Sequence, residues 1–211
     1  NGPPAGFRAA VEGQATASGE LAEPRTAQGA IELGRLTATV GDFRVENAGP
    51  VALRFDAGRL DIDSFRIQGP NTAFSITGRM GGELDLDAAG AIDLRFLAGL
   101  VPVLRRPHGR LTLEAHVGGT AEALELLGDG KVEDGGFQVR NTNVVFEGLA
   151  GALSFSQNRV IFDGAEARIN GGKAVMSGEV ELVRMMPSRL RLEAQLEEVP
   201  VAIPANLPVT L

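Results

Sequence analysis

The stretch GALSFSQNRVIFDGAEARINGGKAVMSG, residues 151–178, decides the fold because it has an earlier counterpart in the same chain. The counterpart is VALRFDAGRLDIDSFRIQGPNTAFSITG, residues 51–78, and the two align without a gap at a shift of one hundred residues. Matched positions include Leu53 with Leu153, Phe55 with Phe155 and Gly78 with Gly178. An internal repeat of this kind predicts an architecture built from repeated units.

Apolar and polar residues alternate within both copies. Leu60 and Ile62, for example, alternate with Asp61 and Asp63. A period of two with one polar face is typical of half-buried strands. The 28 glycines lie singly or in pairs near the ends of short alternating runs, which favours a many-stranded β protein. Strands joined by tight turns predict an antiparallel meander.

Three stretches interrupt the alternation. Around 94–100 the apolar density rises and predicts a short helix or an irregular crossing, ended by Pro102. Helix-forming residues at 121–127 predict one or two helical turns. The glycine-containing runs at 128–130 and 134–136 predict turns between strands.

The apolar face of such a sheet must be covered or must bind something. The pattern alone leaves two solutions open: a filled two-sheet sandwich, or a curled, open sheet. In the second solution the apolar side chains would line a groove. The candidate lining residues are Phe43, Val45, Leu53, Phe55, Leu60, Ile62, Phe65, Ile67, Phe74, Ile76, Leu84, Leu86, Leu111, Leu113, Phe137, Val139, Leu153, Phe155, Val160, Phe162, Ile169, Met176, Val180, Leu182, Leu190 and Leu192.

The two copies differ in the size of their inner side chains. The second has Ala165, Ala167 and Ala174 where the first has Phe65, Ile67 and Phe74. Smaller side chains on the same backbone spacing predict a wider groove in the second half. We expect one domain over 1–211 with two related units, at about 31–118 and 130–211.

Composition excludes several classes of function. A net charge of −7 argues against nucleic-acid binding, which needs a basic face. The absence of cysteine excludes a disulfide framework and a thiolate zinc site. No apolar run reaches the roughly 18 residues of a membrane-spanning helix. The first residue is Asn1 rather than Met, and we expect a fragment of a larger chain.

Catalytic signals are weak. His108 and His116 have no ligand partner at useful spacing, and a Gly-x-Ser-x-Gly nucleophile motif is absent. The carboxylate pairs Asp61/Asp63 and Asp85/Asp87 fall on the polar face, where charges keep a strand soluble. We therefore expect no enzyme activity, no cofactor and no metal. The basic cluster 105–108 fits either a solvated turn or a contact with a lipid headgroup or a partner.

Several segments share a spacing of glycines and apolar residues. They are NAGPVAL (47–53), GRLDI (58–62), FRIQG (65–69), FSITG (74–78), VGGT (117–120), GLAG (148–151) and VPVAIP (199–204). In this spacing the chain resembles the TamB proteins, the AsmA-related family of repeating β-grooves, over most of its length, from about residue 13 onward.

The resemblance implies an all-β fold: an elongated, curled antiparallel sheet, or β-taco, with an apolar inner face and at most one or two short helical turns. It implies a periplasmic chain whose full-length protein is anchored in the inner membrane. It further implies a translocation and assembly module that carries phospholipid acyl chains toward the outer membrane. The partner would be a BamA-like outer-membrane barrel.

Three functions therefore stand as hypotheses. The first is a conduit in which acyl chains lie along the groove. The second is a scaffold that offers strand edges to outer-membrane barrel proteins, such as autotransporters, during assembly and secretion. The third is a closed structural spacer with a filled core.

Overall fold

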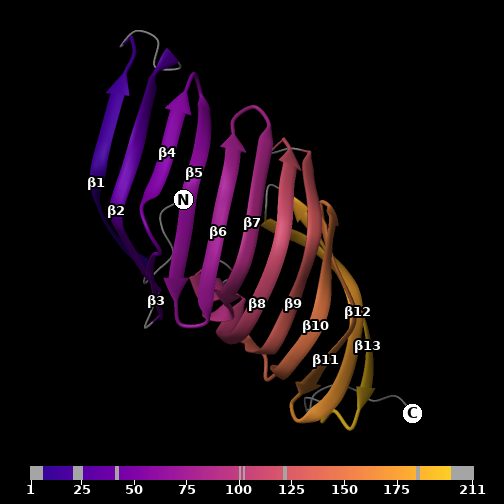
Figure 1. Cartoon of the computed structure of the whole chain (residues 1–211). Coiled ribbons are helices and arrows are strands. Elements are labelled where there is room, and N and C mark those ends of the chain that lie inside the picture. The colour runs from indigo at the N-terminus through magenta and orange to yellow at the C-terminus, as the bar shows by residue number, and fades with distance from the viewer. Residues whose placement is uncertain are drawn as a thin grey trace.

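The described part of the chain forms one antiparallel sheet (Figure 1). The computed structural model describes residues 7–20, 26–40, 43–99, 101, 103–120, 123–183 and 186–200. The predicted all-β class is confirmed. The elements are β1 (Phe7–Ser18), β2 (Gln28–Val40), β3 (Phe43–Asn47), β4 (Val51–Asp56), β5 (Arg59–Gly69), β6 (Thr72–Met80), β7 (Leu84–Asp93), the 3₁₀ helix η2 (Leu94–Gly99), β8 (Leu104–Gly119), β9 (Leu124–Val139), β10 (Val145–Gln157), β11 (Arg159–Ile169), β12 (Gly172–Val183) and β13 (Met186–Glu197).

The topology is a meander. From β5 to β13 each strand pairs with the next one in the chain. Strands β3 and β4 lie in line and both pair with β2 and β5. Asn47 occupies the break between them: its side-chain oxygen accepts from the Leu36 backbone N–H at 2.8 Å, and its amide donates to the Gly34 carbonyl at 3.1 Å. This side chain thus replaces the missing ladder bonds.

The sequence repeat reappears in the strand pairing. Strand β5 covers 59–69 and β11 covers 159–169. Both carry a register shift at the same place, after Ile62 in β5 and after Phe162 in β11. The two hairpins also pair matched residues: Ile67 with Phe74, and Ala167 with Ala174. Equal spacing in the sequence has therefore produced equal turns, bulges and register.

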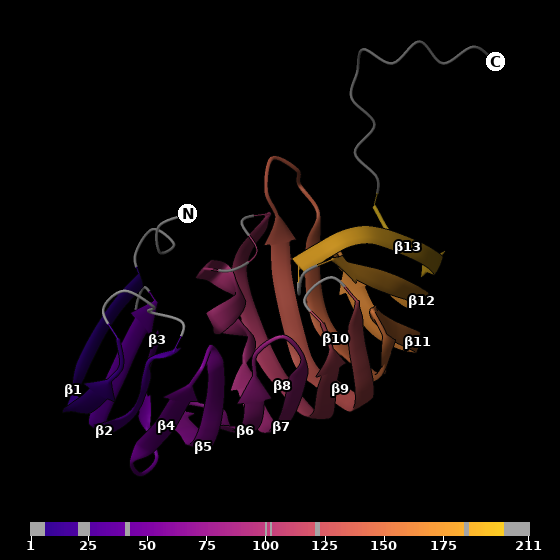
Figure 2. The ribbon, with the colours of Figure 1, turned by 90° about the horizontal axis from the view of Figure 1, so that it is seen from above.

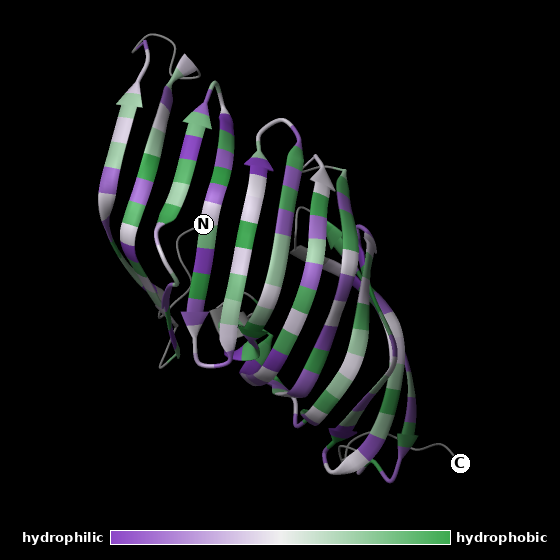
Figure 3. Ribbon diagram, in the orientation of Figure 1, coloured by the Kyte–Doolittle hydropathy of each residue, from purple (hydrophilic) through white to green (hydrophobic). Residues whose placement is uncertain are grey.

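The sheet is curled into an open trough (Figure 2). Green and purple bands alternate along its strands in Figure 3, as expected for one apolar and one polar face. Directly paired residues share a face, so the apolar positions form rows across the strands. One row crosses every strand from β5 to β13: Ile67, Phe74, Gly90, Leu113, Gly130, Leu153, Phe162, Gly178 and Leu192.

Glycines in these rows allow neighbouring backbones and rings to approach. A Cβ at Gly178 would lie 2.2 Å from the Arg191 carbonyl oxygen and 3.0 Å from the Phe162 ring. A Cβ at Gly128 would lie 2.1 Å from the Glu114 carbonyl oxygen. Large residues alternate with glycine because the inner surface of a curled sheet has less room than the outer one.

Two predictions about local structure were wrong. The residues expected as turns at 128–130 and 134–136 lie inside β9, and so do Leu124–Leu127 of the expected helical turns. Residues 121 and 122 lie outside the described part. A glycine inside a strand marks a bulge or a close backbone approach, and this use of glycine outweighs its preference for turns. The packing of Leu124 and Leu126 likewise outweighs their helix propensity.

The predicted short helix near 94–100 is confirmed as η2. Pro102, expected to end it, lies outside the described residues. Helix η2 contacts β8 and also β2, which stands on the other side of β3 to β7 in the strand order. It therefore lies across the inner face of the first half of the trough.

Replacing Gly178 with alanine should destabilise the fold by about 1–3 kcal/mol, because the new methyl group meets a backbone oxygen. Gly82→Ala is the matched control, since a Cβ there has nothing within 4 Å. Chemical denaturation monitored by circular dichroism would measure both midpoints. An unchanged midpoint for Gly178→Ala would contradict the close packing described for this row.

Candidate functional site

A hollow of about 450 Å³ lies on the inner face of the second half. This apolar hollow is lined by strands β8 to β13 and by Val103 just before them. None of its lining residues has a polar side chain. They are Val103, Leu104, Val132, Phe137, Val139, Phe146, Leu149, Gly151, Leu153, Phe162, Ala165, Met176, Leu190 and Leu192.

The curl of the sheet brings the two walls of the hollow together. Val103 lies just before β8 and Leu104 is its first residue. Leu190 and Leu192 lie on β13, five strands further along the sheet. Leu190 is 59% exposed and Leu192 is 47% exposed. Nothing in the described part of the chain covers this wall, so apolar surface faces an open space.

Bulges produce the stronger curvature of this half. The β9–β10 and β10–β11 pairings shift register at several places between Phe146 and Leu153. Gly148 has a positive φ of 59° in this segment. A bulge bends its strand and increases the local twist. It also moves Leu149 to the inner face, out of step with strict alternation.

Small side chains form the floor next to the hollow. Ala165 pairs with Met176 and Ala167 pairs with Ala174. These residues are between 2% and 8% exposed, and Phe146, Leu149, Phe162 and Ile169 lie around the buried Ala167, Ala174 and Met176. The apolar hollow thus occurs in the half whose inner side chains are smaller.

Half of the lining was predicted from the sequence. The predicted residues that line the hollow are Phe137, Val139, Leu153, Phe162, Met176, Leu190 and Leu192. The lining residues that the prediction missed are Val103, Leu104, Val132, Phe146, Leu149, Gly151 and Ala165. Alternation from Leu153 could have identified Gly151, whereas Val132 is out of step with Phe137 because the register shifts between these two positions. The bulges hide Phe146 and Leu149, and only the curl identifies Val103 and Leu104.

Most of the other predicted residues lie on the same apolar rows outside the hollow. In the first half they are half-buried on the inner face, as Leu53, Ile62 and Leu86 are. At the far ends of β8 and β9 from the hollow, Val117, Leu124 and Leu126 form a buried cluster. Leu84, Leu86, Phe155 and Leu182 pack against it. This end of the trough is filled by side chains.

Phe43 and Val45, predicted to line an open groove, are instead covered. They are 3% and 5% exposed, and the Arg95 guanidinium of η2 lies 4.9 Å from the centroid of the Phe43 ring. The Phe43 ring thus packs against η2, and Val45 is buried as well.

A buried carboxylate anchors η2. Asp93 is 2% exposed and accepts from Arg95 Nε at 2.9 Å, from Arg95 Nη2 at 2.8 Å and from the Arg95 backbone N–H at 2.9 Å. Its own N–H donates to Thr72 Oγ1 at 3.1 Å. Burial alone would raise the pKa of the Asp93 carboxyl, but Arg95, with a smaller contribution from Asn71, holds that pKa below its usual range.

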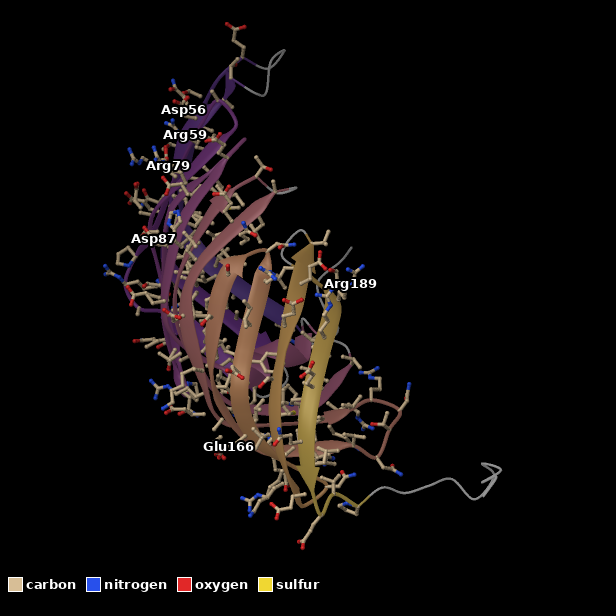
Figure 4. All side chains as sticks on the ribbon, turned by 90° about the vertical axis from the view of Figure 1, so that its right-hand side faces the viewer. Asp56, Arg59, Arg79, Asp87, Glu166 and Arg189 are labelled. Atoms are coloured by element: carbon tan, nitrogen blue, oxygen red, sulfur yellow. The ribbon has the colours of Figure 1, made fainter. Side chains whose placement is uncertain are left out.

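The outer face carries paired charges (Figure 4). Arg54 forms a two-bond contact with Asp63 at 2.6 Å, and Asp87 lies 2.9 Å from His116 Nδ1. Hydrogen bonding to Arg54 lowers the pKa of the Asp63 carboxyl. The four carboxylates considered as catalytic candidates are thus each engaged by a nearby arginine or histidine side chain.

Residues that could hold a metal are not gathered anywhere in the described ranges. Across those same ranges, no helix combines the length and apolar character needed to span a membrane. Comparisons of the chain with family models, with curated proteins and with solved structures find no match.

Asp93→Asn should lower the free energy of unfolding at pH 7 by about 1–3 kcal/mol, because it removes charge-assisted hydrogen bonds in a buried setting. Because the pKa of the Asp93 carboxyl is lower in the folded than in the unfolded state, the ionised carboxylate stabilises the fold at pH values above 3.8, the ordinary pKa of this group. This stabilisation is lost as the pH falls through the pKa of the folded state. The difference between wild type and Asp93→Asn should therefore shrink below about pH 4.

Denaturant titrations from pH 7 to pH 3 would measure this difference. Asp63→Asn, which removes a partner from an exposed ion pair, is the control and should lower the free energy of unfolding by less. A pH-independent gap between Asp93→Asn and wild type would contradict the assigned ionisation.

Proposed function

We propose that this chain is a non-enzymatic carrier of lipid acyl chains, which lie along the apolar inner face of the sheet. The observation that supports the proposal most directly is the apolar hollow, whose lining has no polar side chain and whose β13 wall is exposed. Its volume of about 450 Å³ falls in the usual range of small-molecule sites, roughly 300–1,000 Å³.

The energetics suit a long hydrocarbon chain. Each buried methylene contributes about 0.8 kcal/mol, so ten of them contribute about 8 kcal/mol. Association costs about 4–15 kcal/mol in lost freedom of motion. Short apolar molecules therefore bind weakly, whereas long acyl chains can bind without any specific polar contact.

The continuous rows favour transport over storage. The same row of paired residues contains Ile67 and Phe74 of the first half and Leu153 and Phe162 of the second. A chain moving along the trough would exchange one apolar contact for another of the same kind. With the resemblance to TamB proteins, this supports a phospholipid conduit in the periplasm, acting with a BamA-like barrel and an inner-membrane anchor.

The second candidate is a scaffold for outer-membrane barrel assembly. Strands β1 and β13 each pair on one side only within the described sheet, so each has a free backbone edge. Such edges can bind an extended strand by β-augmentation. In that case prolines in the two edge strands should impair function more than charges in the trough.

Leu153→Asp should reduce the acyl lipid that co-purifies with the folded protein by at least tenfold, because it places a charge in the hollow. Ala152→Asp is the matched control, since the neighbouring residue is exposed. Mass spectrometry of extracts from both variants would measure the difference, with circular dichroism to show that both are folded.

A photo-crosslinker provides a second test that leaves the trough uncharged. Placed at Phe162 it should capture lipid, whereas at the exposed Arg66 it should not. Capture at Arg66 but not at Phe162 would rule out the conduit. Lipid-free protein that still assists barrel assembly would favour the scaffold.

A further inference from the structure

The two end strands of the sheet each have one free backbone edge. Among the described strands, β1 pairs only with β2 and β13 pairs only with β12, and the two lie at opposite ends of the sheet (Figure 1). An odd number of antiparallel steps separates them, so β1 and β13 run in opposite directions. Strand β1 of a second copy laid beside β13 would therefore continue the antiparallel meander.

Both edges expose apolar side chains on the inner face. Val11 of β1 is 59% exposed, and Leu190 and Leu192 of β13 are exposed as well. Val11 belongs to the inner face because it lies two residues from Ala9, which stands in the same ladder row as the buried Val45. A strand added at either edge would remove part of this apolar surface from water.

The outer faces of the two edges carry opposite charges at matching spacing. Arg8 and Glu12 lie four residues apart on β1, and Arg189 and Glu193 lie four residues apart on β13. All four side chains are exposed. Because β1 and β13 run in opposite directions, one antiparallel register places Arg8 opposite Glu193 and also places Glu12 opposite Arg189. Opposite charges that face each other across two strands stabilise the pairing.

The same register brings the exposed apolar residues together. It places Val11 opposite Leu190 and Ala9 opposite Leu192, all on the inner face. A shift of one residue would turn the apolar side chains of one strand outward. One register therefore satisfies both faces of the two edges.

The register also extends a row of alternating charges. Arg159, Glu181 and Arg189 are opposite one another in turn across β11, β12 and β13. On the other edge Glu12 is opposite Arg35 of β2. Arg189 lies 3.5 Å from Glu181, and Arg35 lies 3.5 Å from Glu12. Joined at the two edges, the row alternates in sign over five strands.

Shifts of two residues fit less well. In one direction such a shift places Arg8 opposite Arg191, and like charges in that position destabilise a pair of strands. In the other direction Arg8 meets the neutral Gln195. Glu12 then meets Arg191, so a single ion pair replaces two. The charges thus favour one register over its neighbours.

We propose that the β1 edge of one copy of this chain binds the β13 edge of a second copy, with Arg8 opposite Glu193 and Glu12 opposite Arg189. The interface joins two different surfaces, so each copy keeps a free edge and further copies can add in the same way. The apolar inner face continues from one copy into the next. The inference goes beyond the proposed function and does not rest on it, because pairing of the edges needs no lipid.

Single cysteines test the register, since the chain has no cysteine of its own. In the proposed register Ala10 is opposite Arg191, and both side chains are exposed. Directly opposite residues come within reach of a disulfide. A mixture of A10C and R191C should therefore form a cross-linked dimer under mild oxidation, visible by non-reducing electrophoresis, whereas each variant alone should not.

The matched control is a mixture of T16C and R191C. Thr16 is exposed on the same face of β1 as Ala10, but it lies about 20 Å further along the strand. This mixture should cross-link at least tenfold less than A10C with R191C. Equal yields from the two mixtures would overturn the register.

Exchange of charges tests the ion pair without a cross-link. R8E should weaken self-association at least tenfold in sedimentation velocity, because it places two carboxylates opposite each other. R8E/E193R should restore the association, because the two charges are exchanged. R66E changes the net charge as R8E does, at an exposed position of β5 away from both edges, and should associate as wild type does. Denaturation midpoints would show that all variants fold.

The other outcomes contradict the proposal. Wild type that stays monomeric at every concentration would overturn it, and so would an R8E/E193R variant that associates no better than R8E. Cross-linking of A10C alone, or of R191C alone, without a product from their mixture would show that like edges pair with each other. In each case lipid capture in the hollow is unaffected, so the conduit is judged separately.

Discussion

The pairing of apolar residues across neighbouring strands is the interaction on which the rest of the structure depends. Every strand from β5 to β13 meets the next in a register that keeps inner residues opposite one another. A slip of one residue in any pair would turn that strand's apolar side chains outward. Because the described residues form no second sheet over the inner face, the register of the strands keeps the apolar surface continuous.

Glycine and bulges convert this flat pattern into a trough. Gly90, Gly130 and Gly178 interrupt one row at intervals, and the rings and backbones beside them move closer. The bulges of β10 and β11 add curvature where the side chains are smallest. Curvature and side-chain size act together here, because a wall of large residues could not curl this far without closing the hollow.

The two ends of the trough have different chemistry. In the first half, η2 lies on the inner face, held by a buried carboxylate and one arginine, and it covers Phe43. In the second half the inner face stays open, and the lining of its hollow has no polar side chain. An apolar chain therefore meets a matching open surface in the second half.

The sequence by itself determined the β class, the repeat and the lining residues that follow strict alternation, because each depends on residues close together in the chain. The strands at 59–69 and 159–169, for example, have matched bounds because the two copies share the same spacing. The sequence wrongly predicted a turn at 128–130, because glycine inside a strand has the same signature as glycine in a turn.

Only the tertiary structure decided which residues meet across the trough. Val103 and Leu104 face Leu190 and Leu192 because small bends at many strands add up, and no local pattern encodes that sum. The bulge that turns Leu149 inward and the position of η2 over Phe43 are likewise long-range results. They arise from how the whole sheet curls, and that is why the hollow became visible only in three dimensions.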